Sequence, residues 1–318
     1  MEIVFLDTDT VGIIPNIHLL DQFGHLTCYQ NTSQDETLER IKDADIVITN
    51  KVVINEETIT GAENLKLICV AATGMNNIDK TAAMNRGIQV CNVSDYSTNS
   101  VAQGTFAMLL HILHKISYFD NYVKEGSYSQ STIFTHFGRT FWELTGKRFG
   151  IIGMGNIGRQ VAKIAVAFGA EVVYYSASGK NNQQPYLQLE LEEVLRTSDV
   201  VSVHAPLNTD TENLLDYDRL KVMKRSAILL NAGRGGIVNE ADLAIALNEG
   251  LIAGAGIDVF TREPILPENP LLKVDNTEKI VLMPHVTWAS LESRTILVEK
   301  LCTNIEKFIK EENRTIKL

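Results

Sequence analysis

The fold of this chain is decided by residues 147–169, which have the sequence KRFGIIGMGNIGRQVAKIAVAFG. The apolar run FGII at 149–152 predicts a buried strand, and the pattern G-x-G-x-x-G follows it at 153–158. A helix-like stretch comes next, and the strand-like run EVVYYS covers 171–176. This order of strand, glycine turn, helix and strand predicts a parallel βαβ unit.

Each glycine of the turn has a distinct use in dinucleotide binding. Gly153 allows the tight turn, Gly155 lets the backbone approach a pyrophosphate, and Gly158 lets helix and strand pack closely. The N–H groups at the start of the following helix then face the anion. Glycines also mark ordinary turns, but the strand before and the helix after favour a site for NAD or NADP.

The alternation of strands and helices extends in both directions from this unit. The strand-like runs before it are EIVFLD (2–7), ADIVITN (44–50), LKLICVAAT (65–73) and IQVCNV (88–93). The runs after it are SDVVSVHAP (198–206), AILLNAG (227–233), GAGIDV (254–259) and KIVLMPH (279–285). Near-continuous apolar runs are typical of parallel strands that are covered on both faces. The sequence therefore predicts an α/β fold with two parallel sheets.

Two helical segments set the expected domain boundaries. Apolar residues at helical spacing predict one helix over about 99–124, and a connection without an assigned role covers 125–146. Residues 290–312 predict an amphipathic helix that returns to the first domain. The expected domains are 1–98 with 287–318, and 99–286.

Composition excludes several classes of protein. At 318 residues the chain is long enough for two cores, and its formal charge of −10 argues against a nucleic-acid partner. The 4 cysteines show neither a disulfide framework nor a spacing to histidine that suggests zinc, so no metal is expected. The chain lacks a membrane-spanning apolar run, and its N-terminus lacks the positive charge of a signal peptide. We therefore expect a cytoplasmic protein without a membrane partner.

Three ionisable residues follow strand-like runs in the second domain. Arg234 comes after AILL, Glu263 after GAGI and His285 after KIV. Ligands of open α/β sheets bind outside the carboxyl ends of the strands, so the three side chains could converge on one crevice. Taken singly, Arg234 could be a loop charge, Glu263 could close a turn, and His285 could be structural. Their joint placement after the glycine turn favours a site.

Reduction of a 2-keto acid requires this set of side chains. An arginine can hold the substrate carboxylate by two hydrogen bonds. A histidine can donate a proton to the carbonyl oxygen as hydride arrives at C2. A carboxylate beside the histidine favours the imidazolium and orients the ring. We therefore expect Arg234, Glu263 and His285 to be catalytic.

Seven stretches resemble, in order, the signatures of the D-isomer-specific 2-hydroxyacid dehydrogenase family. They lie within roughly residues 65–295. They are AATGMNNID, TNSVAQGTFAMLL, GIIGMGNIGRQVA, SVHAPLNTDT, LLNAGRGGIVNEADLAIAL, GAGIDVFTREP and MPHVTWAS. The resemblance implies two Rossmann-like domains, of which the first binds substrate and the second binds the dinucleotide. It further implies an active site in the interdomain cleft, D stereochemistry, and a homodimer formed through the nucleotide domain.

The resemblance also assigns contacts residue by residue. The substrate carboxylate would meet the backbone of Thr73, Gly74 and Met75. The pyrophosphate would meet Gly155, Asn156 and Ile157. The residues that would flank adenosine and ribose are His204, Ala205, Pro206 and Thr211. The residues that would surround nicotinamide are Ala232, Arg234, Asp258 and His285. Trp288 and the loop around Met75 resemble the glycerate dehydrogenase and hydroxypyruvate reductase branch. The resemblance implies that the indole of Trp288 caps a small substrate pocket. Trp288 could equally be a packing residue.

The second strand of the βαβ unit ends without the usual acid. An Asp or Glu there would hold the ribose hydroxyls of NAD and repel the 2′-phosphate of NADP. Ser176 stands at that end, Glu171 only begins the strand, and Lys180 in the following loop is either a phosphate ligand or a solvated charge. Cofactor use is therefore NAD or NADP, with a lean towards NADP.

Three functions are compatible with these features. The first is reduction of hydroxypyruvate or glyoxylate to D-glycerate or glycolate. The second is oxidation of another small anion such as formate or phosphite, although the formate branch typically replaces the glutamate that is present here as Glu263. The third is a nicotinamide-sensing co-repressor on the same scaffold. The intact Arg–Glu–His set favours an enzyme.

Overall fold

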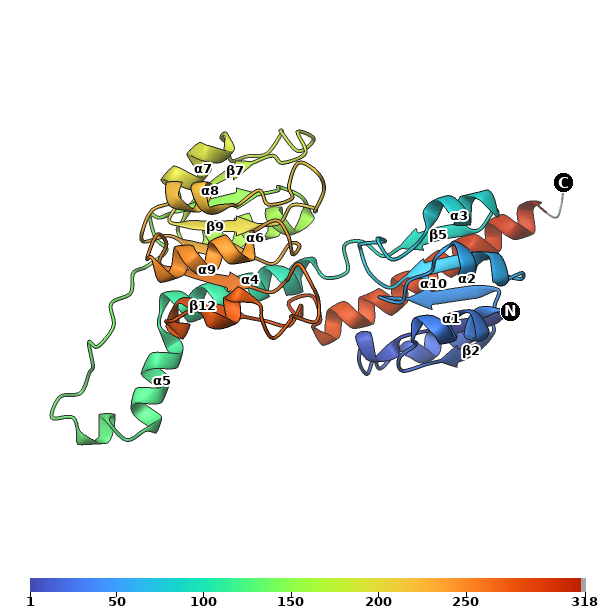
Figure 1. Ribbon diagram of the computed structural model, residues 1–318, viewed down its shortest axis with the longest axis horizontal. Helices are drawn as coiled ribbons and strands as arrows, with labels where there is room; N and C mark the ends of the chain where they lie inside the picture. The colour runs from blue at the N-terminus through green and yellow to red at the C-terminus, as the bar shows by residue number, and fades with distance from the viewer. Residues whose placement is uncertain (316–318) are drawn as a thin grey trace. The chain divides into compact units, whose positions relative to one another are not determined.

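The structure, a computed structural model, describes residues 1–315 and the side chains as far as residue 311. The chain divides into two units, Met1–Ser97 with Ala289–Leu318, and Thr98–Trp288. These boundaries lie within two residues of the expected ones. Each unit is built on a parallel sheet (Figure 1), so the predicted fold class is confirmed.

The first unit has a five-stranded parallel sheet in the order β2-β1-β3-β4-β5. Its strands are β1 (Glu2–Phe5), β2 (His25–Cys28), β3 (Ile46–Thr49), β4 (Leu67–Val70) and β5 (Gln89–Asn92). Its helices are η1 (Thr8–Thr10), η2 (Ile17–Phe23), α1 (Gln34–Ile41), α2 (Glu56–Gly61), α3 (Lys80–Asn85) and α10 (Leu291–Thr315). The central strands β3 and β4 are buried along their whole length, which is why they are continuously apolar.

The C-terminal helix α10 belongs to the first unit although it is last in the chain. It packs on η2 and β4. Its buried apolar side chains recur at helical spacing and are Leu297, Val298, Leu301, Ile305 and Phe308. This apolar stripe is the one that predicted an amphipathic helix.

The second unit has a seven-stranded parallel sheet in the order β12-β11-β10-β9-β6-β7-β8. Its strands are β6 (Arg148–Ile152), β7 (Glu171–Tyr175), β8 (Leu187–Gln188), β9 (Val200–Val203), β10 (Ile228–Asn231), β11 (Gly254–Ile257) and β12 (Ile280–Leu282). The strand order reverses between β6 and β9. Such a switch point is where ligands bind to open α/β sheets.

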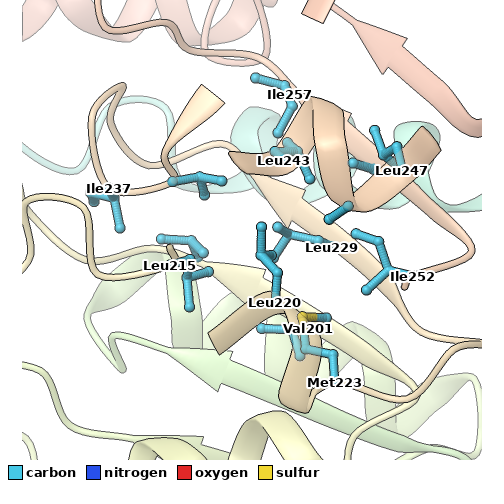
Figure 2. Packing of buried hydrophobic residues seen from close by; sticks show 14 of the residues in the cluster. Val201, Leu215, Leu220, Met223, Leu229, Ile237, Leu243, Leu247, Ile252 and Ile257 are labelled. Atoms are coloured by element: carbon cyan, nitrogen blue, oxygen red, sulfur yellow. The ribbon is translucent and has the colours of Figure 1, made fainter. Parts of the chain in front are cut away.

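Helices cover both faces of this sheet. Its α-helices are α4 (Thr98–Leu113), α5 (Ile116–Lys124), α6 (Asn156–Ala167), α7 (Leu191–Thr197), α8 (Tyr217–Val222) and α9 (Glu240–Asn248). Its shorter 3₁₀ helices are η3 (Tyr128–Gln130), η4 (Pro270–Lys273) and η5 (Thr277–Lys279). Helices α4 and α6 enclose one core with the sheet, while α7, α8 and α9 enclose the other. Figure 2 shows this second core, where Leu243 and Leu247 of α9 lie over Leu229 of the sheet.

The predicted helix over 99–124 is wrong in one respect, because the structure has two helices there. The chain breaks at Lys115, whose φ of 55° is left-handed. A residue in that conformation cannot continue the hydrogen bonds of a right-handed helix. Helix α5 therefore leaves α4 and leads into the connection 125–146, which forms an arm of the second unit (Figure 1).

Two strands were not predicted. Strands β2 and β8 are edge strands with exposed or half-buried residues, and neither has an apolar run. An edge strand has one neighbour and is less buried, so its sequence carries a weaker signal. In the part of the chain that the structure describes, no helix is long and apolar enough to cross a membrane.

Candidate active site

The glycine turn between β6 and α6 has the geometry that a dinucleotide requires. Gly153 has a φ of 94°, and a Cβ there would lie 2.7 Å from the backbone N of Ala205. A Cβ at Gly158 would lie 2.2 Å from the carbonyl oxygen of Gly153. At Gly155 a Cβ would meet no atom within 4 Å, so this glycine faces open space. The first and third glycines are required by packing, whereas the second keeps room for a ligand.

Two buried polar atoms near this turn lack partners among the described residues. Ser176 is buried at the end of β7, and its hydroxyl has no hydrogen-bond partner. His204 follows β9; its Nε2 lies 2.8 Å from the Ser202 hydroxyl, but its Nδ1 has no partner. Buried polar groups are normally hydrogen-bonded. These orphaned atoms beside an open glycine turn fit a polar ligand such as the adenosine ribose of NAD or NADP.

Burial also fixes the charge of His204. It lowers the pKa of the imidazole to about 3, so the ring is neutral near pH 7. Loop 205–211 continues from it and is closed by Thr211, whose hydroxyl donates to the carbonyl of Pro206 at 2.6 Å. The Thr211 hydroxyl therefore holds the loop. Lys180, also expected at the cofactor, is exposed in the loop after β7.

Glu263 and His285 are in direct contact at the carboxyl edge of the second sheet. The Nδ1 atom of His285 lies 2.7 Å from Glu263 Oε2. The other oxygen of Glu263 accepts from the backbone N of Phe260 at 3.0 Å, which fixes the carboxylate. With Nδ1 held in this way, Nε2 is the ring atom left for proton transfer.

Asp258 holds the backbone that carries His285. It is buried after β11, and its carboxylate accepts from the backbone N of Val286 at 2.8 Å and the Thr287 hydroxyl at 2.5 Å. The N–H of His285 donates to the Asp258 carbonyl at 2.8 Å. His285 itself has a left-handed φ of 51°. Burial raises the pKa of Asp258, although the hydrogen bonds from Thr287 and Val286 oppose this effect.

Arg234 follows β10, the strand next to β11. Its Nη1 donates to the carbonyl of Gly233 at 2.8 Å, and its own carbonyl accepts from the Asn231 side chain at 3.0 Å. The Asn231 side chain is buried and also accepts from the N–H of Gly233, so it shapes the turn that presents Arg234. Strands β10, β11 and β12 are adjacent in the sheet. Arg234 follows β10, Glu263 follows β11 and His285 follows β12. Ala232, also expected near nicotinamide, is buried at the start of this turn.

The residues expected to bind the substrate carboxylate belong to the first unit. Thr73, Gly74 and Met75 follow β4, and the side chain of Asn92 donates to the Thr73 carbonyl at 2.6 Å. Trp288 closes the second unit, where it is half-buried against the core of α4 and α6. This contact matches the packing alternative for the indole.

Two residues of this region were missed by the sequence reasoning. Arg159 lies in the first turn of α6, where it donates to the Met154 carbonyl at 3.1 Å and contacts the Asn156 side chain. Thr287 is buried, is held by Asp258, and accepts at its carbonyl from the Ser100 hydroxyl at 2.5 Å. Both lie within stretches that resemble the family, but their residue types alone carry no signature of a role there.

The family described as D-isomer specific 2-hydroxyacid dehydrogenase, NAD binding domain, matches residues 106–287. That range is more than half of the chain and contains the glycine turn, Glu263 and His285. The chain belongs to the D-isomer-specific 2-hydroxyacid dehydrogenase family. It is therefore an NAD(P)-dependent oxidoreductase, and the resemblance inferred from its motifs is confirmed.

Several known proteins are similar to this chain over nearly its whole length. The glycerate dehydrogenase of Methylorubrum extorquens is 36% identical over 97% of this chain and 96% of its own. The hydroxypyruvate reductase of Blautia hydrogenotrophica is 38% identical over 92% of this chain and 91% of its own. A solved D-lactate dehydrogenase of Aquifex aeolicus, complexed with NAD and lactic acid, has a TM-score of 0.82 and 25% identity, and covers 100% of this chain and 98% of its own.

Proposed function

We propose that this dehydrogenase reduces small 2-keto acids, principally hydroxypyruvate and glyoxylate, to D-glycerate and glycolate. The single observation that carries the proposal is the 2.7 Å contact between His285 and Glu263 at the carboxyl edge that Arg234 shares. It supplies a proton donor, its orienting carboxylate and a cation for an anionic substrate. The choice of substrates is supported by relatives named glycerate dehydrogenase, hydroxypyruvate reductase and glyoxylate reductase.

In the proposed mechanism each side chain has one task. Bound nicotinamide supplies the hydride that is added to C2. His285 donates a proton from Nε2 to the carbonyl oxygen, and Glu263 stabilises the imidazolium through Nδ1. Arg234 binds the substrate carboxylate, a task that the family resemblance also assigns to the backbone N–H groups of Thr73, Gly74 and Met75. Asp258 fixes the segment that carries His285, and the glycine turn with Asn156 and Ile157 holds the pyrophosphate. The placement of this site in the cleft between the two units stays a prediction.

Cofactor use is proposed to extend to NADP, with a modest preference for NADPH over NADH. The buried, unpartnered hydroxyl of Ser176 stands where an acid would exclude the 2′-phosphate. Lys180 in the next loop is exposed and can reach an anion as a mobile cation.

The enzyme is further proposed to act as a cytoplasmic homodimer formed through the arm of the second unit. The arm 125–146 exposes Phe134 by 89% and Phe137 by 83%. Exposed aromatic residues of this kind mark surfaces that become buried in an interface. A second copy of the chain is the occupant that the family resemblance implies.

The decisive experiment compares wild type with His285→Ala on a panel of hydroxypyruvate, glyoxylate, pyruvate and phenylpyruvate. We expect highest kcat/KM for hydroxypyruvate, and a loss of roughly 10²–10⁴-fold in kcat for the variant with nearly unchanged NADH affinity. His25→Ala is a matched control, because it removes another histidine–carboxylate pair (His25 Nδ1 to Glu2 Oε2, 3.0 Å) on an edge strand. Near wild-type turnover by His285→Ala would refute the catalytic set. A wild type that binds NADH but reduces none of the acids would favour a nicotinamide-sensing binding protein.

A further inference from the structure

A buried carboxylate at the end of β1 organises the carboxyl edge of the first sheet. Asp7 is only 2% exposed, and its oxygens accept from three consecutive backbone N–H groups. The distances are 2.9 Å from Asn50, 2.6 Å from Lys51 and 3.2 Å from Val52. Three N–H groups converging on one carboxylate fix the backbone of the loop that follows β3.

The same loop is linked to the segment after β1. The Asn50 side chain, which is buried, donates to the Thr10 hydroxyl at 3.1 Å. The Thr49 hydroxyl accepts from the N–H of Val52 at 3.0 Å and lies 3.3 Å from Asp7. Loop 50–52 is therefore held at both ends around the Asp7 carboxylate.

This loop in turn supports the segment after β4. The Asn77 side chain donates to the carbonyl of Val52 at 2.9 Å, and the N–H of Ile54 donates to the carbonyl of Asn77 at 2.9 Å. Strands β1, β3 and β4 are neighbours in the sheet, so their following loops lie at one edge. A continuous chain of hydrogen bonds runs from Asp7 through Val52 to Asn77, two residues after Met75.

We propose that Asp7 is a positioning residue for substrate binding. It fixes loop 50–52, and that loop fixes, through Asn77, the turn whose N–H groups at Thr73, Gly74 and Met75 hold the substrate carboxylate. The inference rests on the proposed function. Asp7 does not touch substrate in this role; it acts through the hydrogen bonds of the two loops.

Loosening the turn at 73–75 should change KM and not kcat. The substrate carboxylate is held equally in the ground state and in the transition state, so a looser turn weakens both. Such uniform loss raises KM and leaves kcat nearly unchanged. The cofactor contacts lie in the other unit, so NADH affinity is unaffected.

The test uses the full-length enzyme with Asp7→Asn, Asn77→Ala and the control Asp45→Asn. Asp45 is a carboxylate of the same unit that accepts from the N–H of Glu2 at 2.9 Å, but at the amino ends of the strands. For Asp7→Asn we expect a rise in the KM for hydroxypyruvate of roughly tenfold to 100-fold, with kcat within about threefold of wild type. Asn77→Ala should shift KM in the same direction without touching a buried charge. Asp45→Asn should leave KM unchanged.

Two further readouts separate positioning from a general loss of structure. Amide exchange should accelerate in residues 50–54 and 73–77 of Asp7→Asn, while the Kd for NADH stays at the wild-type value. An active wild type whose KM is unmoved by both Asp7→Asn and Asn77→Ala would overturn the positioning role alone. A wild type inactive on every keto acid would overturn the proposed function, and with it the role of Asp7 in substrate binding.

Discussion

His204 shows how a single histidine links the proposed cofactor site to stability. Its ring is neutral in the folded protein because burial lowers its pKa to about 3, whereas a histidine in an unfolded chain titrates near pH 6.5. As the pH falls below about 6.5 the unfolded state takes up the proton first. The stability that this group contributes is therefore complete above about pH 6.5 and is lost progressively towards pH 3.

Replacing His204 by Gln should remove this loss of stability at low pH. Between pH 7 and pH 5 wild type should lose up to about 2 kcal/mol of unfolding free energy through this group, and the variant should not. Urea unfolding at the two pH values measures the difference. His18→Gln is the control, since His18 is exposed. Equal losses in wild type and His204→Gln would show that the ring does not titrate in this way.

At the same scale, Ser176→Asp tests the cofactor proposal. The new carboxylate at the end of β7 should accept from the ribose hydroxyls of NADH and repel the 2′-phosphate of NADPH. We expect the ratio of kcat/KM for NADH to that for NADPH to rise by at least about tenfold, the equivalent of roughly 1.4 kcal/mol. Both cofactors are measured at matched ionic strength. A wild type that already strongly prefers NADH would contradict the interpretation of Ser176.

The β6–α6 turn is the element whose local structure and proposed function coincide most closely. Gly158 is enclosed by the carbonyl of Gly153, while Gly155 faces open space. Both glycines were assigned these separate uses from sequence, because the strand and helix around them restrict the turn to one geometry. An alanine at Gly158 and an alanine at Gly155 should therefore change different properties of the protein.

Gly158→Ala should cost stability, and Gly155→Ala should cost affinity. In the first variant the new Cβ overlaps the Gly153 oxygen, an overpacking that typically costs about 1–3 kcal/mol. In the second, the Cβ occupies the space proposed for the pyrophosphate, so Tm should stay near wild type while the Kd for NADH rises roughly tenfold or more. Thermal unfolding and fluorescence titration separate the two effects. Unchanged NADH binding by Gly155→Ala would place the pyrophosphate elsewhere.

At the scale of the whole molecule, the arm 125–146 determines the expected assembly. It is attached to its own unit by the ion pair of Arg139 with Glu278 and by the stacking of Tyr122 on His136. Its Phe141 packs against His114 and Phe119, whereas Phe134 and Phe137 are the most exposed phenylalanines of the arm. A standard interface buries about 1,600 Å² in total, and aromatic residues are enriched at its centre.

Introducing charge on the arm should therefore dissociate the dimer. We expect Phe134→Glu with Phe137→Glu to convert the enzyme to a monomer in sedimentation velocity, because carboxylates cannot be buried there without a partner. Met84→Glu, on α3 and 72% exposed, is the matched control and should leave the mass unchanged. If wild type is already monomeric, or if the doubly charged arm leaves a dimer intact, the arm is not the interface.

The sequence by itself determined the two parallel sheets, the glycine turn and the strand ends that carry Arg234, Glu263 and His285. Those features depend on periodicity and on short-range turn chemistry, which are visible within a few residues. The break of the predicted 99–124 helix at Lys115 and the edge strands β2 and β8 were not visible. The edge strands are exposed or half-buried and lack an apolar run, and the helical spacing of apolar residues continues across Lys115 although its backbone turns left-handed.

Only the tertiary structure decided how the expected side chains are held. The contact of Glu263 with His285 joins residues 22 positions apart, and the bond from the Asn50 N–H to Asp7 spans 43. The place of Asp258 beside nicotinamide stays a prediction, and the structure adds that its carboxylate binds the backbone at 286–287. A sequence shows which groups can make hydrogen bonds, and burial then requires each group to find a partner. Which partner it finds depends on the register of neighbouring strands and the path of their loops, and these are fixed only when the whole sheet has formed.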